Sequence, residues 1–243
     1  MRLTKFNPVL EVEEKLVGTD YVVGDIHGMY SLLMQELVSI GFDSTKDRLF
    51  SVGDLVDRGP ENKEVVELLK EDWFFAVCGN HEQMCIENVY HSHEYPELYR
   101  RHASNGGVWF CLEEFHKQKQ IADIFSCLPV IIELKVDNLK IGIIHADVGN
   151  SWTLLKRNLN SIVGRKVLNH EDFHKSLWGR TKITKAVDTI CYGIDHVFLG
   201  HTPVQNIVKL GNCHFIDRGS CTHQMFFTII DIKTYLKKLN ESN

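Results

Sequence analysis

The chain has 243 residues, of which 44% are hydrophobic and 24% are charged, and its formal net charge is −5 at pH 7. This length and composition predict a globular protein with a sizeable core. Acidic and basic residues are intermixed, so no broad electropositive face for nucleic acid is expected. No apolar run approaches the roughly 20 residues of a membrane-spanning helix, so no membrane contact is expected either.

The N-terminal sixteen residues lack the apolar core of a signal peptide and carry acidic residues instead. Seven cysteines are dispersed along the chain without a C-x-x-C pair. An odd number of scattered cysteines is typical of reduced thiols rather than of a disulfide framework. We therefore expect a cytoplasmic protein.

The first ninety residues alternate between short apolar runs, polar loops and amphipathic segments. The apolar runs predict strands at 21–23, 49–52 and 73–77. The amphipathic segments predict helices at 29–41, at 61–70 and in the stretch that runs to Tyr90. Strand, loop and helix repeated three times indicate βαβ units and a parallel sheet.

The rest of the chain changes character at Pro129. Residues 91–128 are predicted to be mainly helical, with a turn at Asn105-Gly106-Gly107. After Pro129 come short β-rich runs: VIIELKV, KIGIIH, VFLG, NIVKL, CHFID and MFFTIID. Residues 149–176 show the weakest pattern and are expected to form a long loop with some helix. One domain with two β-rich halves is the simplest interpretation, and a division near residue 129 is the alternative.

Five apolar runs end in polar clusters that share Asp, His and Asn. These clusters contain Asp25 and His27; Asp54, Asp57 and Arg58; Asn80 and His81; His145; and His201. Ligand groups in open α/β sheets collect beyond the carboxyl ends of the strands, so the clusters should converge. A single Asp-x-His is more often part of a turn, but five such strand ends favour a metal site.

The types of side chain narrow what this site could hold. Carboxylate, imidazole and amide oxygen donors suit Mn²⁺, Fe or Zn²⁺ better than a thiolate site would. With one aspartate placed to bridge, the donors suffice for two metals about 3.5–4 Å apart, as in phosphatases and nucleases.

The motifs GDIHG, GDLVDRG, GNHE, the strand end at His145 and GHTP resemble the signature of the phosphoprotein phosphatases. Within that family the chain is most similar to the compact bacteriophage lambda-type and bacterial serine/threonine phosphatases. The similarity continues through LPVIIEL and FIDRGS and so covers most of the chain. It implies an α/β fold of the calcineurin-like metallophosphoesterase type, with a central β-sandwich of two mixed sheets flanked by helices. The active site would lie at the carboxyl ends of the strands of a single domain, 1–243.

The resemblance also implies which residues hold metal. The first metal would be held by Asp25, His27 and a bridging Asp54. The second would be held by Asp54, Asn80, His145 and His201. Mn²⁺ is the expected ion at both positions, with Fe, Zn²⁺, Co²⁺ and Ni²⁺ as alternatives.

The remaining motif residues would act on the phosphate. His81 would be the general acid, oriented by Asp57, and Asn80 and Arg58 would bind the phosphate. Arg180, in the run Trp178-Gly179-Arg180, is the expected second phosphate-binding arginine, and Arg165 is the alternative. Hydroxide bridging the two metals would attack phosphorus directly, without a covalent phospho-enzyme.

The expected substrates are proteins and peptides that carry phosphoserine or phosphothreonine, and phosphotyrosine is left open. The resemblance implies a cytoplasmic enzyme, either bacterial or phage-encoded and acting in the host cytosol. Cys78 stands where phage relatives tend to have arginine, which also leaves substrate preference open. The sequence does not fix the oligomeric state and slightly favours a monomer.

Two other functions compete with this one. Symmetrical dinucleoside tetraphosphatases share the metal motifs but usually have ARG and NHD where this chain has Asp57-Arg58-Gly59 and Asn80-His81-Glu82, which favours the protein phosphatase. A non-catalytic binding module should have lost ligands or the acid histidine, and this chain retains the full set.

Several other residues are given structural roles. Among the histidines in the polar stretch 91–102, His102 is expected to be solvated rather than part of a site. Glu82 and Asp147 are expected to fix loops beside the site, and Trp109 and Trp152 are expected to be packing residues.

Overall fold

The computed structural model of the chain describes residues 6–162, 170–221 and 227–241. Within these residues, ten strands form two mixed sheets. The larger sheet contains, in spatial order, β1 (Val9–Val12), β5 (Ile131–Val136), β6 (Leu139–Ile144), β7 (His196–Leu199), β9 (Cys213–Phe215) and β8 (Val208–Leu210). The smaller sheet contains β10 (Ile229–Asp231), β2 (Asp20–Val23), β3 (Arg48–Ser51) and β4 (Phe74–Ala76).

The helices lie between and after the strands. They are α1 (Tyr30–Ser39), α2 (Asn62–Leu68), α3 (Asn80–Tyr90), α4 (Pro96–His102), α5 (Val108–Cys111), α6 (Phe115–Phe125), α7 (Trp152–Asn160), α8 (Glu171–Trp178), α9 (Thr181–Thr184) and α10 (Ile232–Glu241). A short connection, Ala103–Gly107, joins α4 to α5 and is kinked at Gly106, where φ is 102°. The turn expected at Asn105-Gly106-Gly107 coincides with this kink, because the backbone of Gly106 is not helical.

The predicted parallel arrangement of the first three strands is confirmed. β2 pairs in parallel with β3, and β3 pairs in parallel with β4. The C-terminal β10 adds to β2 in the antiparallel direction, which makes this sheet mixed. In the larger sheet β6, β7 and β9 run parallel, whereas β5 and β8 are antiparallel to their neighbours β6 and β9.

The two sheets pack face to face, and alternation along the strands separates two cores. Val22 and Phe50 point into one cluster of buried apolar side chains, together with Ile143 of the larger sheet. The next residue of β2, Val23, points the other way and packs in the cluster that contains Leu33 of α1. Successive side chains of a strand face opposite sides, so one apolar run serves both cores.

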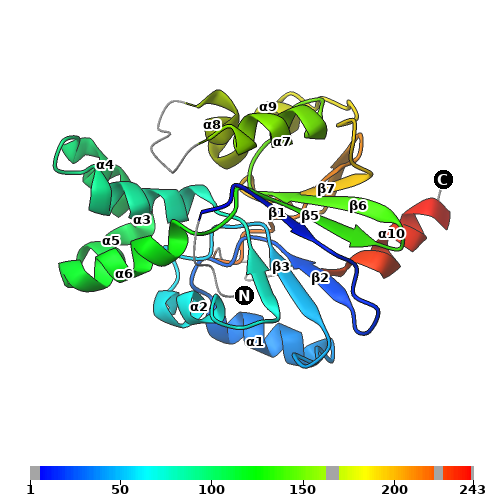
Figure 1. Cartoon of the computed structure of the whole chain (residues 1–243). Helices are drawn as coiled ribbons and strands as arrows, with labels where there is room; N and C mark the ends of the chain where they lie inside the picture. Colours follow the sequence, from blue (N-terminus) through cyan, green and yellow to red (C-terminus); the bar gives the residue numbers. More distant parts are fainter. Residues whose placement is uncertain (1–5, 163–169, 222–226, 242–243) are drawn as a thin grey trace.

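Figure 1 shows how the helices cover this sandwich. α1 and α2 lie along the outer side of the smaller sheet, and α7, α8 and α9 lie on the outer side of the larger sheet. α3, α4, α5 and α6 gather at one end of the sandwich. α3 begins there directly after β4, so this helical end borders the loops that follow the strands.

The expectation of a long loop over residues 149–176 was wrong. α7 and α8 occupy most of this range, although 163–169 lie outside the described residues. Trp152, Leu155 and Leu159 are buried and lie three and four residues apart, which is helical spacing on one face. The N-cap Ser151 accepts a hydrogen bond from the backbone N–H of Leu154 (3.2 Å) and fixes the start of α7. In the described parts of the chain, no helix is both long enough and apolar enough to cross a bilayer.

A buried histidine of β9 makes the stability of the fold depend on pH. His214 is fully buried, its Nε2 lies 3.0 Å from Nδ1 of His196, and its Nδ1 lies 3.1 Å from the hydroxyl of Tyr235. Burial, and then the neighbouring His196, lowers the pKa of His214 to about 3. The unfolded chain therefore binds a proton at this residue below pH ~6.5, whereas the folded protein does not until pH ~3.

We expect the free energy of unfolding to fall as the pH drops from about 6.5 toward 3. His214 contributes about 1.4 kcal/mol per pH unit within that window. In His214→Gln the free energy of unfolding should depend less steeply on pH, by the amount that corresponds to about one bound proton. Urea unfolding at several pH values measures this slope. His93→Gln, which changes an exposed histidine, is the control and should keep the wild-type slope. Equal slopes in wild type and His214→Gln would contradict this assignment.

Candidate active site

The polar clusters that follow five strands converge at one end of the sandwich. The loops after β2, β3 and β4 come from the smaller sheet, and those after β6 and β7 come from the larger sheet. Backbone hydrogen bonds join neighbouring loops: His27 N–H donates to the carbonyl of Asp54 (2.8 Å), and Gly200 N–H donates to that of His145 (2.8 Å). The predicted convergence at the carboxyl ends of the strands is therefore present.

Backbone strain is concentrated in these loops. Eight non-glycine residues of the described chain have a positive φ. Five of them are residues named from the sequence: His27, Asp54, Asp57, Arg58 and His201, with φ between 47° and 72°. Non-glycine residues rarely adopt this conformation, and it persists where the surroundings hold it, often at functional sites.

One cluster of hydrogen-bond acceptors surrounds Nε2 of His145. Its Nδ1 lies 2.8 Å from the carbonyl oxygen of Val52, to which it donates, so Nε2 carries the lone pair in the neutral ring. That nitrogen lies 2.9 Å from Oδ1 of Asn80, 3.2 Å from Nδ1 of His201 and 3.3 Å from Oδ1 of Asp54. Four acceptors that face one point are compatible only if a proton or a cation lies between them.

The second cluster is built around the other oxygen of Asp54. Nε2 of His27 and Nε2 of His81 each lie 3.8 Å from Oδ2 of Asp54. The ring of His27 is fixed by its Nδ1, which donates to the carbonyl of Val56 (3.0 Å). The guanidinium of Arg58 lies over this cluster, with Nη1 2.7 Å from Nε2 of His27 and Nη2 3.0 Å from Nε2 of His81. Asp54 thus presents one oxygen to each cluster.

The electrostatics of both clusters favour a bound cation. Burial lowers the pKa of His27 and of His201 to about 3, so both rings are neutral at pH 7 and can donate a lone pair. Burial opposes ionisation of Asp54, but the rings of His145 and His81 hold its pKa well below its ordinary value. Burial also opposes a charged His145, yet the carboxylate of Asp54 raises its pKa.

Asp25 lies beside these clusters, but its carboxylate is engaged elsewhere. Both oxygens accept from the backbone N–H of His201, at 3.1 and 3.0 Å. Among the described residues, three groups have ligand atoms within 4.8 Å of one another. Two of them, His27–Asp54–His81 and Asp54–His145–His201, form these clusters, and Asp25 is in none of the three. Burial, and then the carboxylates of Asp217 and Asp54, raises the pKa of Asp25 well above its ordinary value. Three acids in one buried region are mutually destabilising unless positive charge is added.

A buried His–Asp pair adjoins the clusters. Nδ1 of His81 lies 2.7 Å from Oδ2 of Asp57, and neither side chain is exposed. Burial would raise the pKa of Asp57, but hydrogen bonds from His102 and His81 lower it to about 2. Asp57 is therefore a carboxylate that accepts from Nδ1–H of His81 and fixes the direction of its Nε2.

The two arginines named from the sequence differ in setting. Arg58 lies on the strained turn after β3 and is exposed on one side. Arg180 is the N-cap of α9, and its Nη1 donates to the hydroxyl of Thr202 (3.0 Å), directly after His201. Arg180 is thus placed at the edge of the same site. Arg165 lies outside the described residues.

The loops around the site are fixed by two buried acids, as expected. Glu82 accepts from the backbone N–H groups of Asp54 (3.0 Å), Leu55 (2.8 Å) and Gly79 (2.8 Å). Asp147 accepts from the N–H of Thr181 (2.9 Å) and so ties the loop after β6 to the start of α9.

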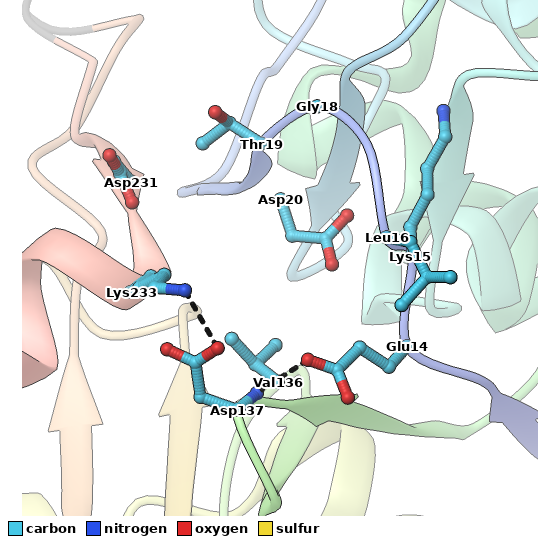
Figure 2. Close-up of a pocket in the computed structure, with 10 residues that line it drawn as sticks. All are labelled: Glu14, Lys15, Leu16, Gly18, Thr19, Asp20, Val136, Asp137, Asp231 and Lys233. Atoms are coloured by element: carbon cyan, nitrogen blue, oxygen red, sulfur yellow. Dashed lines mark hydrogen bonds and ion pairs between the residues drawn. The ribbon is translucent and has the colours of Figure 1, made fainter.

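The cavity shown in Figure 2 is a different feature. It has a volume of about 340 Å³ and lies beside Asp20, the first residue of β2, at the end of that strand opposite to the histidines. Two of its acids already have partners: Asp20 pairs with Arg48 (2.6 Å) and Asp137 with Lys233 (2.7 Å). It contains no imidazole, and its chemistry does not resemble that of the two clusters.

Comparison with known proteins decides the family. The family model for calcineurin-like phosphoesterases matches residues 21–205, which spans all five strand-end clusters. This chain is a calcineurin-like phosphoesterase. The phosphoesterases of this family use a dinuclear metal site, and the two clusters joined by Asp54 supply candidate ligands for one.

Relatives of this phosphoesterase carry two kinds of name. Serine/threonine-protein phosphatase 1 of Salmonella typhimurium is 36% identical over 203 residues, which cover 82% of this chain and 86% of that protein. A symmetrical bis(5'-nucleosyl)-tetraphosphatase of Coxiella burnetii is 51% identical, but over only 63 residues, or 26% of this chain and 22% of that protein. A solved serine/threonine phosphatase from Saccharomyces cerevisiae superposes with a TM-score of 0.60 at 17% identity, covering 87% of this chain and 71% of that one.

The sequence did not identify every residue that this phosphoesterase places near the site. His102, expected to be solvated, is fully buried and its Nε2 lies 3.1 Å from Oδ2 of Asp57. Trp109, expected only to pack, donates its indole N–H to Oδ1 of Asp57 (2.7 Å). Neither residue follows a strand, so the pattern that found the other residues could not find these. Trp152 does pack as expected and is fully buried.

Proposed function

We propose that this phosphoesterase is a serine/threonine protein phosphatase, a metal-dependent enzyme in which residues 1–243 act as one domain. The observation that carries the proposal is the buried His81–Asp57 pair beside two acceptor clusters that share Asp54. Hydrolysis of a phosphate monoester needs neutralised charge, an activated water and a proton for the leaving oxygen, and these groups supply each requirement.

We assign the metal ligands as the sequence predicted. Asp25, His27 and Asp54 form the first set, and Asp54, Asn80, His145 and His201 form the second. Two divalent cations held by these residues would neutralise phosphate charge and lower the pKa of a bound water molecule. The oxygen and imidazole donors suit Mn²⁺, and Fe, Zn²⁺, Co²⁺ and Ni²⁺ accept the same donors.

Arg58 has a particular place in this scheme. Its guanidinium donates to Nε2 of His27 and of His81, so it supplies the positive charge near the first set of ligands. For His27 to use the same lone pair as a ligand, Arg58 must release it. The released guanidinium can then donate two N–H groups to two oxygens of a phosphate, and the ammonium group of lysine lacks this planar two-donor geometry. Arg180 and the amide of Asn80 would complete phosphate binding.

The proton for the leaving alkoxide comes from Nε2 of His81. Asp57 accepts from Nδ1 of the ring, which stabilises the protonated imidazole and keeps its other nitrogen directed at the site. A phosphate bound by Arg58 would lie close to that nitrogen, because the guanidinium of Arg58 and the ring of His81 are neighbours in the site.

The substrates we propose are phosphorylated proteins and peptides. The relative that matches most of this chain is named a serine/threonine phosphatase, whereas the tetraphosphatase match covers only a quarter of it. The Asp57-Arg58 pair also favours the phosphoprotein class. We place the activity in the cytoplasm because an odd number of scattered cysteines is typical of reduced thiols rather than of a disulfide framework.

Turnover of four substrates, with Mn²⁺ supplied, tests this proposal. We expect hydrolysis of phosphoserine and phosphothreonine peptides to exceed that of diadenosine tetraphosphate at equal concentration. A phosphotyrosine peptide in the same series determines whether aryl esters are also cleaved. A clear preference for the dinucleotide would make the enzyme a symmetrical tetraphosphatase instead.

A further inference from the structure

More hydrogen-bond donors face the carboxylate of Asp57 than are needed for Asp57 to orient the ring of His81. Besides Nδ1 of His81, it faces the indole N–H of Trp109, 2.7 Å from Oδ1. It also faces Nε2 of His102, 3.1 Å from Oδ2 and 3.3 Å from Oδ1. Its backbone N–H donates to Oδ1 of Asn62 (2.7 Å). An unexposed carboxylate with three side-chain donors has a single orientation in which all of them are satisfied.

The hydrogen bonds of His102 determine which of its nitrogens carries the proton. Nδ2 of Asn88 lies 3.2 Å from Nδ1 of His102, and an amide nitrogen can only donate. Nδ1 is therefore the acceptor of the neutral ring, and Nε2 carries the hydrogen that points at Asp57. Asn88 thus fixes the tautomer of His102 as Asp57 fixes that of His81.

The ring of His102 is also held sterically. A Cβ on Gly107 would overlap Cδ2 and Nε2 of the ring, so the absence of a side chain there allows the close approach. The ring of Phe110 lies on another side, with centroids 5.3 Å apart. The kinked connection Ala103–Gly107 joins His102, at the end of α4, to α5, which contains Trp109, and so brings both residues to the same carboxylate.

A metal site is the competing explanation for this cluster. Ligand atoms of Asp57, Cys85 and His102 lie within 4.8 Å of one another. However, burial, and then the carboxylate of Asp57, raises the pKa of the Cys85 thiol well above its ordinary value, so the thiolate that a soft metal needs is disfavoured. The nitrogen of His102 that faces Asp57 is the protonated one. Hydrogen bonding accounts for the arrangement without an ion.

We propose that His102, together with Trp109, is a positioning residue for proton transfer by His81 and acts through Asp57. Without these two donors the carboxylate could rotate about its χ2 angle, and the bond to Nδ1 of His81 would lose its fixed direction. Nε2 of His81 would then deliver its proton less efficiently to the leaving oxygen. The inference rests on the proposed role of His81 as the general acid.

The test compares two substrates that differ in their need for a proton. A phosphoserine peptide releases an alkoxide that must be protonated, whereas 2,4-dinitrophenyl phosphate releases a stable phenolate. In His102→Leu we expect kcat for the peptide to fall about 10- to 100-fold, a part of the 10²–10⁴ that a general acid supplies. For 2,4-dinitrophenyl phosphate we expect a change smaller than about threefold, because the proton contributes little there.

Three further variants, one of them a surface control, keep the test independent of folding. His102→Gln retains an N–H donor and should recover part of the lost peptide turnover. Trp109→Phe removes only the indole donor and should show the same selective loss. His116→Leu changes an exposed histidine and should match the wild type on both substrates. Metal content is measured for each variant and should remain that of the wild type.

The outcomes separate this inference from the proposed function. His81→Asn measured alongside should show a larger loss that is likewise confined to the peptide. If His81→Asn shows this selectivity and the His102 and Trp109 variants lose both activities equally, His102 is merely structural and the inference is wrong. If His81→Asn loses both activities equally, the general-acid assignment fails and the inference fails with it.

Discussion

Replacement of His81 by asparagine is expected to lower kcat for a phosphoserine peptide by about 10²–10⁴-fold, the usual contribution of a general acid. The pair of His81 with Asp57 is fully buried, and the 2.7 Å contact leaves Nε2 as the only ring nitrogen that can reach the substrate. The side chain of asparagine is similar in length to that of histidine, but it cannot transfer a proton at neutral pH. Steady-state kinetics with saturating Mn²⁺ measure the effect.

The metal content of this variant separates proton transfer from metal binding. His81→Asn should retain about as much bound metal as the wild type, since we assign His81 to no metal. His116→Asn, on the surface, should retain both metal and activity. An unchanged kcat in His81→Asn would exclude the proton-donor role, and loss of metal would instead make His81 a ligand of the His27–Asp54–His81 group.

Replacement of Asp54 by asparagine is expected to remove the shared ligand of both clusters. Asp54 presents Oδ1 to His145 at 3.3 Å and Oδ2 to His27 at 3.8 Å, so loss of its charge weakens both sites at once. Metal content, measured by elemental analysis, should fall from two ions per chain to one or none. Mutation of a residue that only hydrogen-bonds to a metal ligand typically lowers metal affinity or activity by about 10–100-fold. Loss of the bridging ligand itself should therefore lower kcat by more than about 100-fold.

A second buried aspartate provides the matched control. Asp47 is also buried and accepts from the backbone N–H groups of Thr19 and Asp43, both at 2.8 Å, but it is not in either cluster. Asp47→Asn should bind as much metal as the wild type even if it is less stable. Chelation should abolish wild-type activity, and added Mn²⁺ should restore it. Full activity in a metal-free preparation would contradict the two-metal scheme.

The arrangement of Arg58 connects these two predictions. The same guanidinium contacts a proposed ligand, His27, and the proposed acid, His81. Binding of metal and binding of phosphate would both draw Arg58 away from these rings. Under the proposed function, the turn after β3 would carry three roles on neighbouring residues: Asp54 for metal, Asp57 for orientation of the acid and Arg58 for phosphate.

The sequence predicted the parts of the site that follow a strand. Side-chain direction is fixed where a strand ends and a tight loop begins, so Asp25, His27, Asp54, Asn80, His145 and His201 could be placed at one edge from their positions alone. Strands β2, β3 and β4 were also predictable, because an apolar run followed by polar residues and an amphipathic helix has few alternatives. Some helix was expected in residues 149–176, but the extent of α7 and α8 was not predicted, because their apolar residues are sparse within a polar stretch.

The sequence by itself thus determined the family, the parallel βαβ unit and the set of residues to which we assign the chemistry. The tertiary structure decided the contacts that depend on distant segments. It brings His102 and Trp109, 45 and 52 residues after Asp57, onto that carboxylate, and it divides the oxygens of Asp54 between two clusters. No local pattern encodes such contacts, because they depend on the packing of a helical connection against a turn from another part of the chain. The spacing of residues in the sequence determines where a side chain leaves the backbone, and tertiary packing determines which other side chains it contacts.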